Sequence, residues 1–286
     1  MELANNWVDY EIIATGNGYK LERWKDVVLL RPDPQVIWPS SVDMDGYKTL
    51  NAKYVRSETG GGKWQKNKPM PDEWVISYGN LKFLIKPMGF KHTGLFPEQA
   101  VNWDIMANLI KSANRPINVL NLFAYTGGAT VACLNAGASV CHVDAAKGMV
   151  ERAGENCRLS GVGDGKVRFI VDDCLKFVKR EIRRGKKYDA IIMDPPSFGR
   201  GPNGETWKIE NELFNLVKTC IEVLSDNPLF FLINSYTTGL QPQVIKNILS
   251  LNMQGFNGNI EAYEVGLPTD EGIALPCGCS GIWTAK

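Results

Sequence analysis

The stretch Asn121-Leu122-Phe123-Ala124-Tyr125-Thr126-Gly127-Gly128 decides the fold, because here a strand predicted over Ile117 to Leu122 gives way to a helix starting near Ala129. The adjacent glycines would let backbone N–H groups approach a ligand closely, and the positive end of the helix dipole points at the same place. Junctions of this kind are where open α/β sheets bind ligands. The stretch therefore predicts a ligand site that would stabilise a carboxylate.

A second predicted strand, Val140-Cys141-His142-Val143-Asp144, ends in an acid. An acid at this position can accept hydrogen bonds from a ribose diol, which indicates a ribose-bearing cofactor. A dinucleotide and S-adenosylmethionine (SAM) compete for that role. A pyrophosphate needs the G-x-G-x-x-G spacing, whereas this turn has only its glycine pair, so the pattern favours SAM. A glycine turn beside a solvated Asp explains either feature when it is taken alone.

Strands and helices alternate from residue 117 onward, which is typical of a doubly wound α/β sheet with parallel strands. Asp144, the pair Asp172 and Asp173, Asp194 and Asn234 each follow a predicted strand. Because the carboxyl ends of parallel strands share one edge, we expect these polar groups to gather there. The predicted strands are Ile117 to Leu122, Val140 to Val143, Val167 to Val171, Tyr188 to Met193 and Leu229 to Asn234, with Ile260 to Val265 and Gly281 to Ala285 as an antiparallel closure.

The amino-terminal part reads differently from the rest of the chain. Short alternating runs from Trp7 to Trp38 predict a small antiparallel β unit, and Trp74 to Pro87 predicts another strand pair. Residues 40–72, which include Gly60-Gly61-Gly62, are predicted to be rich in loops. Helical spacing follows from Glu98 to Lys111. We therefore expect a small β-rich subdomain over residues 1–85 and the α/β domain over residues 86–286.

Composition indicates an ordinary globular protein of 286 residues, with 44% hydrophobic residues and a net charge of +1. No apolar run approaches the roughly 20 residues of a membrane span, and Met1 to Tyr10 lacks signal-peptide features, so we expect a cytoplasmic protein without a membrane partner. Seven cysteines, mostly in apolar stretches, suggest reduced core thiols. Cys277-Gly278-Cys279 is too tight for a zinc knuckle and far from His92 and His142, so we expect no metal site.

Charge is distributed unevenly along the chain. The segment Lys48–Lys91 is basic, and Trp64 and Trp74 are interleaved with its charges. Such a mixture could grip phosphates and stack on bases, which suggests an RNA partner, although a solvated surface over two core tryptophans explains it equally well. The basic residues are Lys48, Lys53, Arg56, Lys63, Lys66, Lys68, Lys82, Lys86 and Lys91, against the acids Glu58, Asp72 and Glu73.

The motif Asp194-Pro195-Pro196-Ser197-Phe198 follows the fourth strand of the predicted sheet. Two consecutive prolines fix φ and remove two backbone donors, which leaves rigid carbonyl acceptors. In a methyltransferase, Asp194 and the Pro195 carbonyl could hold an exocyclic amine in line with the sulfonium methyl, while Phe198 stacks on the base. A Pro-Pro loop with a capping Asp is the structural alternative.

Together these segments resemble the class I SAM-dependent methyltransferases, in the group that includes bacterial 23S ribosomal RNA large-subunit methyltransferases. The resemblance covers nearly the whole chain. It implies a Rossmann-like seven-stranded SAM methyltransferase sheet with a small N-terminal β subdomain. The matching segments are Tyr19 to Arg23, Arg31 to Gln35, Lys91 to Gln99, Asn121 to Gly128, His142 to Asp144 and Asp194 to Gly201.

The resemblance also assigns roles to single residues. Phe96 and Gln99, in a segment folded over the methionine end of SAM, would contact the cofactor. The turn formed by Phe123, Ala124, Tyr125, Thr126 and Gly127 would hold the methionine part. Asp144, with Ala145 beside it, would bind the ribose. Asp173 would bind the adenine amine; Asp172 is its rival, and for Asp172 the role of helix N-cap is favoured.

Several functional alternatives remain at this stage. An RNA methyltransferase leads, with methylation of DNA, protein or a small metabolite as the runner-up. The absent G-x-G-x-x-G disfavours a nicotinamide oxidoreductase, and a non-catalytic nucleic-acid binder on the same fold is a third class. Methylation of cytosine C5 needs a nucleophilic Cys, and neither the Asp194 motif nor Asn234-Ser235-Tyr236-Thr237-Thr238 contains one. We therefore favour N-methylation, unless Cys277 or Cys279 reaches the pocket.

Overall fold

The computed structural model describes residues 1–57, 61–200, 204 and 206–286 in two compact units. The larger unit comprises Met1–Glu2, Val101–Val265 and Cys277–Lys286, and the smaller one comprises Leu3–Ala100 and Gly266–Pro276. Gly60 of the predicted loop and Gly201 at the end of the resembling segment lie outside the described residues. The compact units divide near residue 100, whereas the expected domain boundary at residue 85 stays a prediction.

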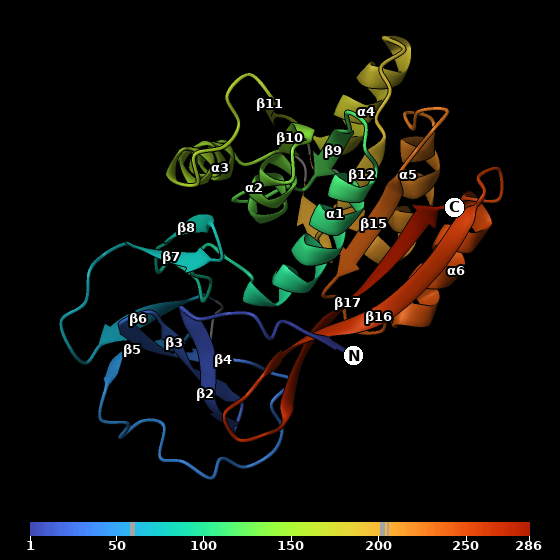
Figure 1. The fold of residues 1–286 in the computed structure, drawn as a ribbon. Helices are drawn as coiled ribbons and strands as arrows, with labels where there is room; N and C mark the ends of the chain where they lie inside the picture. The colour runs from blue at the N-terminus through green and yellow to red at the C-terminus, as the bar shows by residue number, and fades with distance from the viewer. Residues whose placement is uncertain (58–60, 201–203, 205) are drawn as a thin grey trace. The chain divides into compact units, whose positions relative to one another are not determined.

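The sheet of the larger unit has the order β1-β16-β17-β15-β12-β9-β10-β11 over the described residues (Figure 1). β9, β10, β11, β12 and β15 pair in parallel, and β17 is antiparallel to β15. The seven predicted strands are confirmed, and the two-residue β1 adds an eighth. The strands are β1 (Glu2–Leu3), β9 (Asn118–Leu122), β10 (Ser139–Asp144), β11 (Val167–Val171), β12 (Ala190–Met193), β15 (Phe230–Ser235), β16 (Gly258–Pro268) and β17 (Ala274–Ala285).

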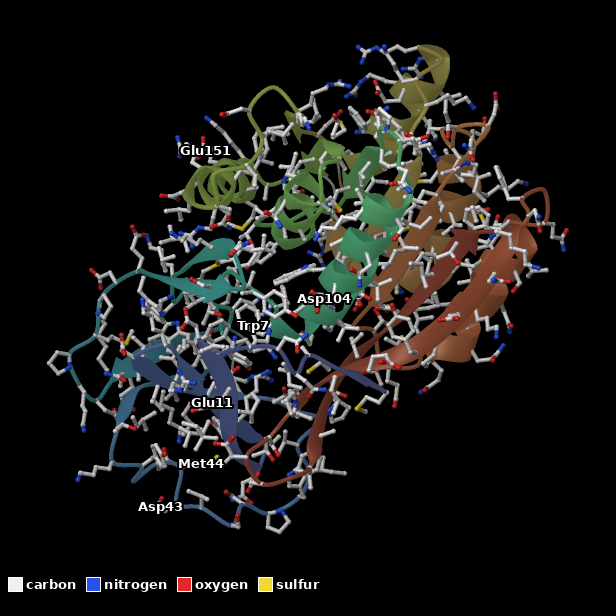
Figure 2. The ribbon with its side chains drawn as sticks, in the orientation of Figure 1. Trp7, Glu11, Asp43, Met44, Asp104 and Glu151 are labelled. Carbon is white, nitrogen blue, oxygen red and sulfur yellow. The ribbon has the colours of Figure 1, made fainter. Side chains whose placement is uncertain are left out.

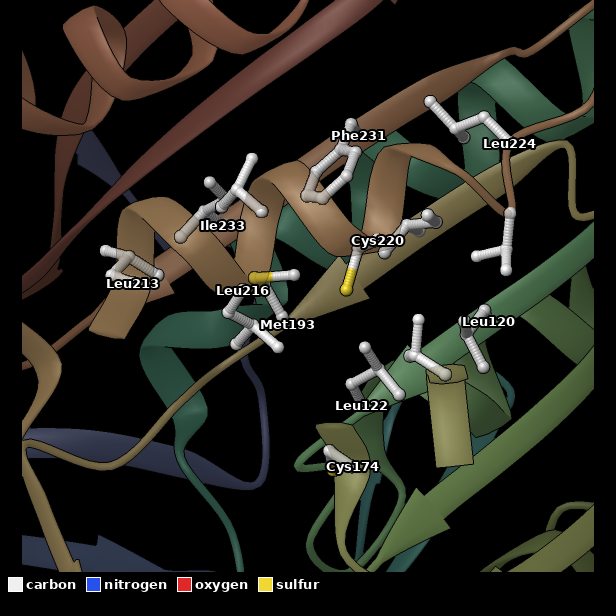
Figure 3. Close-up of a cluster of buried hydrophobic side chains, with 14 of the residues drawn as sticks. Leu120, Leu122, Cys174, Met193, Leu213, Leu216, Cys220, Leu224, Phe231 and Ile233 are labelled. Atoms are coloured by element: carbon white, nitrogen blue, oxygen red, sulfur yellow. The ribbon is translucent and has the colours of Figure 1, made fainter. Parts of the chain in front are cut away.

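Helices cover both faces of this sheet. The core in Figure 3 joins Leu120 and Leu122 of β9 to apolar side chains of α4, α5 and α6, whereas the intervening Asn121 bonds to Thr130 of α2 on the other face. Among the described helices none is long and apolar enough to span a membrane. The helices are α1 (Ala100–Ser112), α2 (Gly128–Asn135), α3 (Lys147–Leu159), α4 (Cys174–Arg183), α5 (Ile209–Ile221) and α6 (Pro242–Asn252).

The order of the strands indicates where a ligand would bind. The chain proceeds from β9 outward through β10 and β11, then returns to place β12 on the other side of β9. The two connections therefore diverge at the carboxyl ends of β9 and β12, where open α/β sheets bind ligands. Leu122, Asp144 and Met193 end the three strands at this edge. The predicted gathering of polar groups at one edge is confirmed.

The smaller unit contains more regular structure than the sequence indicated. Its main sheet has the order β2-β3-β4-β5-β6, and β7 pairs separately with β8. The prediction of loops over residues 40–72 was wrong for β5 and β6, because Leu50, Ala52 and Tyr54 are buried alternately beside β4. The strands are β2 (Tyr10–Gly16), β3 (Tyr19–Trp24), β4 (Val27–Pro32), β5 (Leu50–Arg56), β6 (Gly62–Lys66), β7 (Trp74–Tyr78) and β8 (Leu81–Ile85).

A buried ion pair holds the smaller unit together. Arg31 donates from Nε to Glu22 Oε2 at 2.5 Å and from a terminal nitrogen to Glu22 Oε1 at 2.7 Å. A third donation, at 3.0 Å, reaches the carbonyl of Lys91. Burial alone would raise the pKa of Glu22, but the charges of Arg31 and Lys20 outweigh it and lower that pKa. Three of the sequence segments that resemble the methyltransferases therefore meet at one guanidinium.

The first residues of the smaller unit are fixed by Trp7 and Glu11, both labelled in Figure 2. The Trp7 indole donates at 2.9 Å to the carbonyl of Pro97, the first residue of the short 3-10 helix η1 (Pro97–Gln99). Glu11 pairs with Arg23 at 2.6 Å on the surface. The segment containing Lys91 and Pro97 is thus anchored to its own unit at two carbonyls.

Replacing Arg31 by Met should lower the free energy of unfolding by about 3 to 5 kcal/mol, because it leaves the Glu22 carboxylate buried without its main partner. Replacing Arg23 by Met is the matched control, since the exposed Arg23–Glu11 pair is worth only about 0 to 1 kcal/mol. Urea unfolding of the full chain measures both variants. Similar losses for the two arginines would contradict a dominant role for the buried pair.

Candidate functional site

The turn after β9 has an unusual backbone conformation. Phe123 and Tyr125 have positive φ angles of 55° and 50°, and Gly127 follows at 83°. A left-handed residue other than glycine costs on the order of 1 to 3 kcal/mol and persists only where the surroundings fix it. Such strain is concentrated at functional sites, so the turn is a strong candidate for ligand contact.

The protein itself holds this turn through its backbone N–H groups. Phe123 donates to Cys174 Sγ at 3.2 Å, Ala124 donates to the Val143 carbonyl at 3.1 Å, and Gly127 donates to the Ala124 carbonyl at 3.0 Å. These three N–H groups are therefore engaged within the protein. The expectation that N–H groups of the turn reach a ligand applies instead to the start of α2, where Gly127 is an N-cap without a side-chain acceptor.

The glycine pair is required for packing. A Cβ on Gly127 would lie 2.8 Å from Ala153 Cβ on α3, and a Cβ on Gly128 would lie 2.7 Å from the Trp103 ring on α1. Both distances are shorter than van der Waals contact. The pair thus lets α1 and α3 approach the turn, a reason that the sequence argument missed.

Asp144 joins the loops that follow three strands. Its Oδ2 accepts the Tyr125 N–H at 2.8 Å, and its Oδ1 accepts the Ala146 N–H at 2.8 Å. Its backbone carbonyl accepts the Asp172 N–H at 3.1 Å. Each carboxylate oxygen can accept two hydrogen bonds, so a ribose diol can be accommodated beside these contacts. Ala145, which directly follows Asp144, is exposed.

A buried polar row supports the turn from below. Asn121 Nδ2 donates to Thr130 Oγ1 at 2.9 Å, and the Thr130 hydroxyl shares a second hydrogen bond with His142 Nδ1, also at 2.9 Å. Burial lowers the pKa of His142 to about 4, and the Tyr125 carbonyl opposes this shift. His142 is therefore neutral near pH 7 and supports the turn.

The N-cap role expected for Asp172, the first of the two acids after β11, belongs to Asp173 instead. Asp173 is the N-cap of α4, since its Oδ1 accepts the Lys176 N–H at 2.8 Å. The prediction that Asp172 is the N-cap was wrong, because Asp172 pairs with Arg180 and accepts the Asp173 N–H. A cap uses one oxygen of the carboxylate, so Asp173 remains the candidate for an adenine amine.

The Asp194 motif forms a supported loop at the end of β12. Asn234 Nδ2 donates to Asp194 Oδ1 at 3.0 Å, and the Trp207 indole donates to the Pro196 carbonyl at 2.6 Å. The Pro196 carbonyl is therefore engaged, contrary to the expectation of two free acceptors. Phe198 is 51% exposed.

Phe198 begins a short hairpin that the sequence argument did not predict. β13 (Phe198–Arg200) pairs antiparallel with β14 (Thr206–Lys208), placing Phe198 opposite Lys208. The Arg200 guanidinium lies 5.8 Å from the centre of the Phe198 ring. The Trp207 and Phe123 rings lie 6.1 Å apart, so the hairpin reaches the turn after β9.

The remaining predicted residues come from the smaller unit and from β17. Phe96 and Gln99 belong to the smaller unit, where the Phe96 ring lies 5.3 Å from the ring of His92. Their predicted contact with the cofactor therefore stays a prediction. The Cys277-Gly278-Cys279 segment is not a turn, because it lies within β17. The Cys279 thiol donates to the Leu240 carbonyl at 2.9 Å, and burial raises its pKa to about 11.

Comparisons with known proteins agree on one family. A family model described as S-adenosylmethionine-dependent methyltransferase matches residues 36–229. A solved SAM-dependent methyltransferase from Agrobacterium tumefaciens is 33% identical, covers 98% of this chain and 91% of its own, and superposes with a TM-score of 0.92. A protein assigned as a methyltransferase and solved with SAH shares the fold at 19% identity, with a TM-score of 0.75 over 98% of this chain and 76% of its own.

A curated relative from Shewanella frigidimarina, "Ribosomal RNA large subunit methyltransferase K/L", is 30% identical over 232 residues. That match includes 78% of this chain but 31% of the relative. The chain thus spans between a quarter and a third of the length of the curated relatives it matches.

Replacing Asp144 by Ala should weaken binding of S-adenosylhomocysteine (SAH) by about 1.5 to 3 kcal/mol, since it removes charge-assisted hydrogen bonds to the ribose. Calorimetry measures the affinity. Asp164→Ala, which removes an exposed acid from the loop before β11, is the matched control. Unchanged affinity in the Asp144 variant would remove this residue from the cofactor site.

Proposed function

Because the chain belongs to the S-adenosylmethionine-dependent methyltransferases, we propose that it transfers the methyl group of SAM to a base nitrogen in RNA. The observation that carries this proposal is the placement of the Asp194 motif. A carboxylate, the Pro195 carbonyl and an exposed aromatic ring follow β12 at the edge where the strand connections diverge. Those groups suit a planar amine held by hydrogen bonds and by stacking.

The residues at this edge fit SAM. The strained turn from Phe123 to Gly127 would border its methionine part, Asp144 its ribose, and Asp173 its adenine amine. The fit rests on hydrogen-bonding capacity: the Asp144 oxygens can accept hydroxyls beyond their two backbone contacts, and Asp173 uses one oxygen for its cap. When bound, SAM supplies an electrophilic methyl group on a sulfonium.

The acceptor side has to orient a nitrogen and remove its proton. Asp194 and the Pro195 carbonyl would accept hydrogen bonds from the amine, which turns the nitrogen lone pair toward the methyl group. Methylation would require the nitrogen to lose its proton, which the Asp194 carboxylate or water would take. Phe198 would stack on the base and keep its plane fixed.

Nitrogen is favoured over cytosine C5 because the cysteines are unsuited to nucleophilic attack. All seven are buried thiols. Burial raises the pKa of Cys133 to about 12 and that of Cys157 to about 11, so both stay protonated at neutral pH. Cys279, which the sequence left as a candidate, has a pKa raised to about 11, and its thiol donates a hydrogen bond to the Leu240 carbonyl. A nucleophilic cysteine needs a lowered pKa.

RNA as the substrate is supported by the relative named for ribosomal RNA methylation and by the basic segment Lys48–Lys91. In that segment Lys63, Lys66 and Lys68 are exposed on or next to β6. Lys66 has an acidic neighbour, Asp72, at 3.1 Å, so part of the charge is balanced. The Trp64 and Trp74 indoles donate to backbone carbonyls, which favours packing over base stacking for both.

Incubation with labelled SAM should transfer label into RNA, and not into DNA, protein or metabolite fractions, when all are taken from a strain lacking the protein. Asp194→Ala and Phe198→Ala should each lower this transfer about 100-fold, because they misplace the acceptor. SAH affinity, measured by calorimetry, should stay unchanged because neither residue is proposed to hold the cofactor.

The matched controls are Asp226→Ala, an exposed acid before β15, and Phe214→Ala, an aromatic residue 42% exposed on α5. Both should retain full transfer. Label found in the DNA, protein or metabolite fraction would show that the substrate belongs to that class and not to RNA. Parallel losses of SAH affinity and transfer would make the Asp194 loop a support for the cofactor instead.

Reversing the charge of Lys63, Lys66 and Lys68 should weaken RNA binding and flatten its salt dependence, with the slope of log K against log salt falling by about 0.7 for each lost phosphate contact on a single strand. Filter binding at a series of salt concentrations measures the slope. Lys246→Glu on α6 is the control for charge change elsewhere. A slope equal to that of the native chain would leave the segment as solvated surface.

A further inference from the structure

Five polar side chains form a continuous hydrogen-bonded row that ends on Asp194. Tyr263 of β16 donates to Asn102 Oδ1 at 2.9 Å, and Asn102 Nδ2 donates to Ser280 Oγ at 2.9 Å. The Ser280 hydroxyl donates to Asn234 Oδ1 at 2.9 Å, and Asn234 Nδ2 donates to Asp194 Oδ1 at 3.0 Å. The row therefore joins α1, β16, β17 and β15 to the loop after β12.

Every hydrogen bond of this row points the same way. The Ser280 oxygen accepts a hydrogen bond from the Asn102 amide, and the Ser280 hydroxyl donates a hydrogen bond to the Asn234 carbonyl oxygen. That contact turns the Asn234 amide so that its NH2 faces the Asp194 carboxylate. A carboxylate accepts such a donor best when it is ionised. Residues that do not contact Asp194 thus set the direction of the hydrogen bond that Asp194 accepts.

The middle of the row is deeply buried. Asn102, Ser280 and Asn234 are 1%, 0% and 1% exposed. Asn234 and Ser280 are direct neighbours in the β15–β17 register, and the β12–β15 ladder places Asp194 one residue beyond Met193, the partner of Ile233. Buried hydrogen-bonded groups of this kind are held in a single arrangement, because any other leaves a polar atom unpaired.

We propose that Asn234, oriented by Ser280 and Asn102, is a positioning residue that fixes the Asp194 carboxylate against the acceptor nitrogen. The inference rests on the proposed function, in which Asp194 contacts the acceptor. Ser280 and Asn102 act only through Asn234. The row therefore affects the methyl-transfer step and leaves cofactor binding alone.

The test uses Ser280→Ala in the full chain. Single-turnover transfer of label from SAM to total RNA from a strain lacking the protein should slow roughly tenfold, because the Asn234 amide loses the contact that orients it. SAH affinity by calorimetry should be unchanged. Ser280→Thr keeps a hydroxyl and should restore the native rate.

Ser225→Ala is the matched control. The Ser225 hydroxyl also donates to a carboxylate, Asp189 Oδ1 at 2.9 Å, but Asp189 precedes β12 at the opposite end of that strand from Asp194. This variant should keep the native transfer rate. Equal rates for the two alanine variants would overturn the proposal.

A double-variant cycle separates this inference from the proposed function. In an Asp194→Ala background, Ser280→Ala should cause no further loss, because the row has nothing left to position. An additional tenfold loss there would overturn the positioning role while the role of Asp194 stands. Native transfer by Asp194→Ala alone would overturn both.

Tyr263→Phe provides a second entry to the same row in case Ser280→Ala folds poorly. It removes one hydroxyl at the far end and should slow transfer roughly two- to fivefold, again with no effect in the Asp194→Ala background. A loss that persists in that background would count against the row. Urea unfolding of each variant verifies that the chain is folded in the assay.

Discussion

The hydrogen bonds of the Asp144 carboxylate are the constraint on which the candidate site depends. One oxygen holds the Tyr125 N–H and the other holds the Ala146 N–H, so a single side chain fixes the loops after β9 and β10. The Tyr125 N–H belongs to a residue with a positive φ, and its contact helps to offset the cost of that conformation. Protein structure and cofactor recognition therefore use the same carboxylate.

Much of the fold could be predicted because a parallel sheet covered on both faces needs apolar strands, and β12 and β15, which are buried along their whole length, are largely apolar runs. The order of the strands depends on long-range pairing, which local patterns do not contain. The strands β5 and β6 were missed because glycines and charges surround them. The β13–β14 hairpin was missed because three-residue strands give no periodic signal.

The acids of the candidate site could be predicted because each lies at the carboxyl end of a strand or within two residues of it. Their partners could not, since Asn102 and Ser280 are 178 residues apart and meet only when β17 returns beside β15. For the same reason the glycine pair was interpreted through a ligand, whereas Trp103 and Ala153 occupy the space that side chains would need. The N-cap was assigned to Asp172 and not to Asp173 because α4 starts one residue later than expected, and the exact start of a helix is hard to predict.

The buried cysteines have a practical consequence for observing this chain. All seven lie in the larger unit, whereas Trp7, Trp24, Trp38, Trp64 and Trp74, five of the eight tryptophans, lie in the smaller one. The rate of thiol alkylation therefore reports how often the larger unit, which contains the candidate site, opens. Intrinsic fluorescence reports mainly on the other unit. The two signals give separate views of each half of the molecule in an unlabelled native chain.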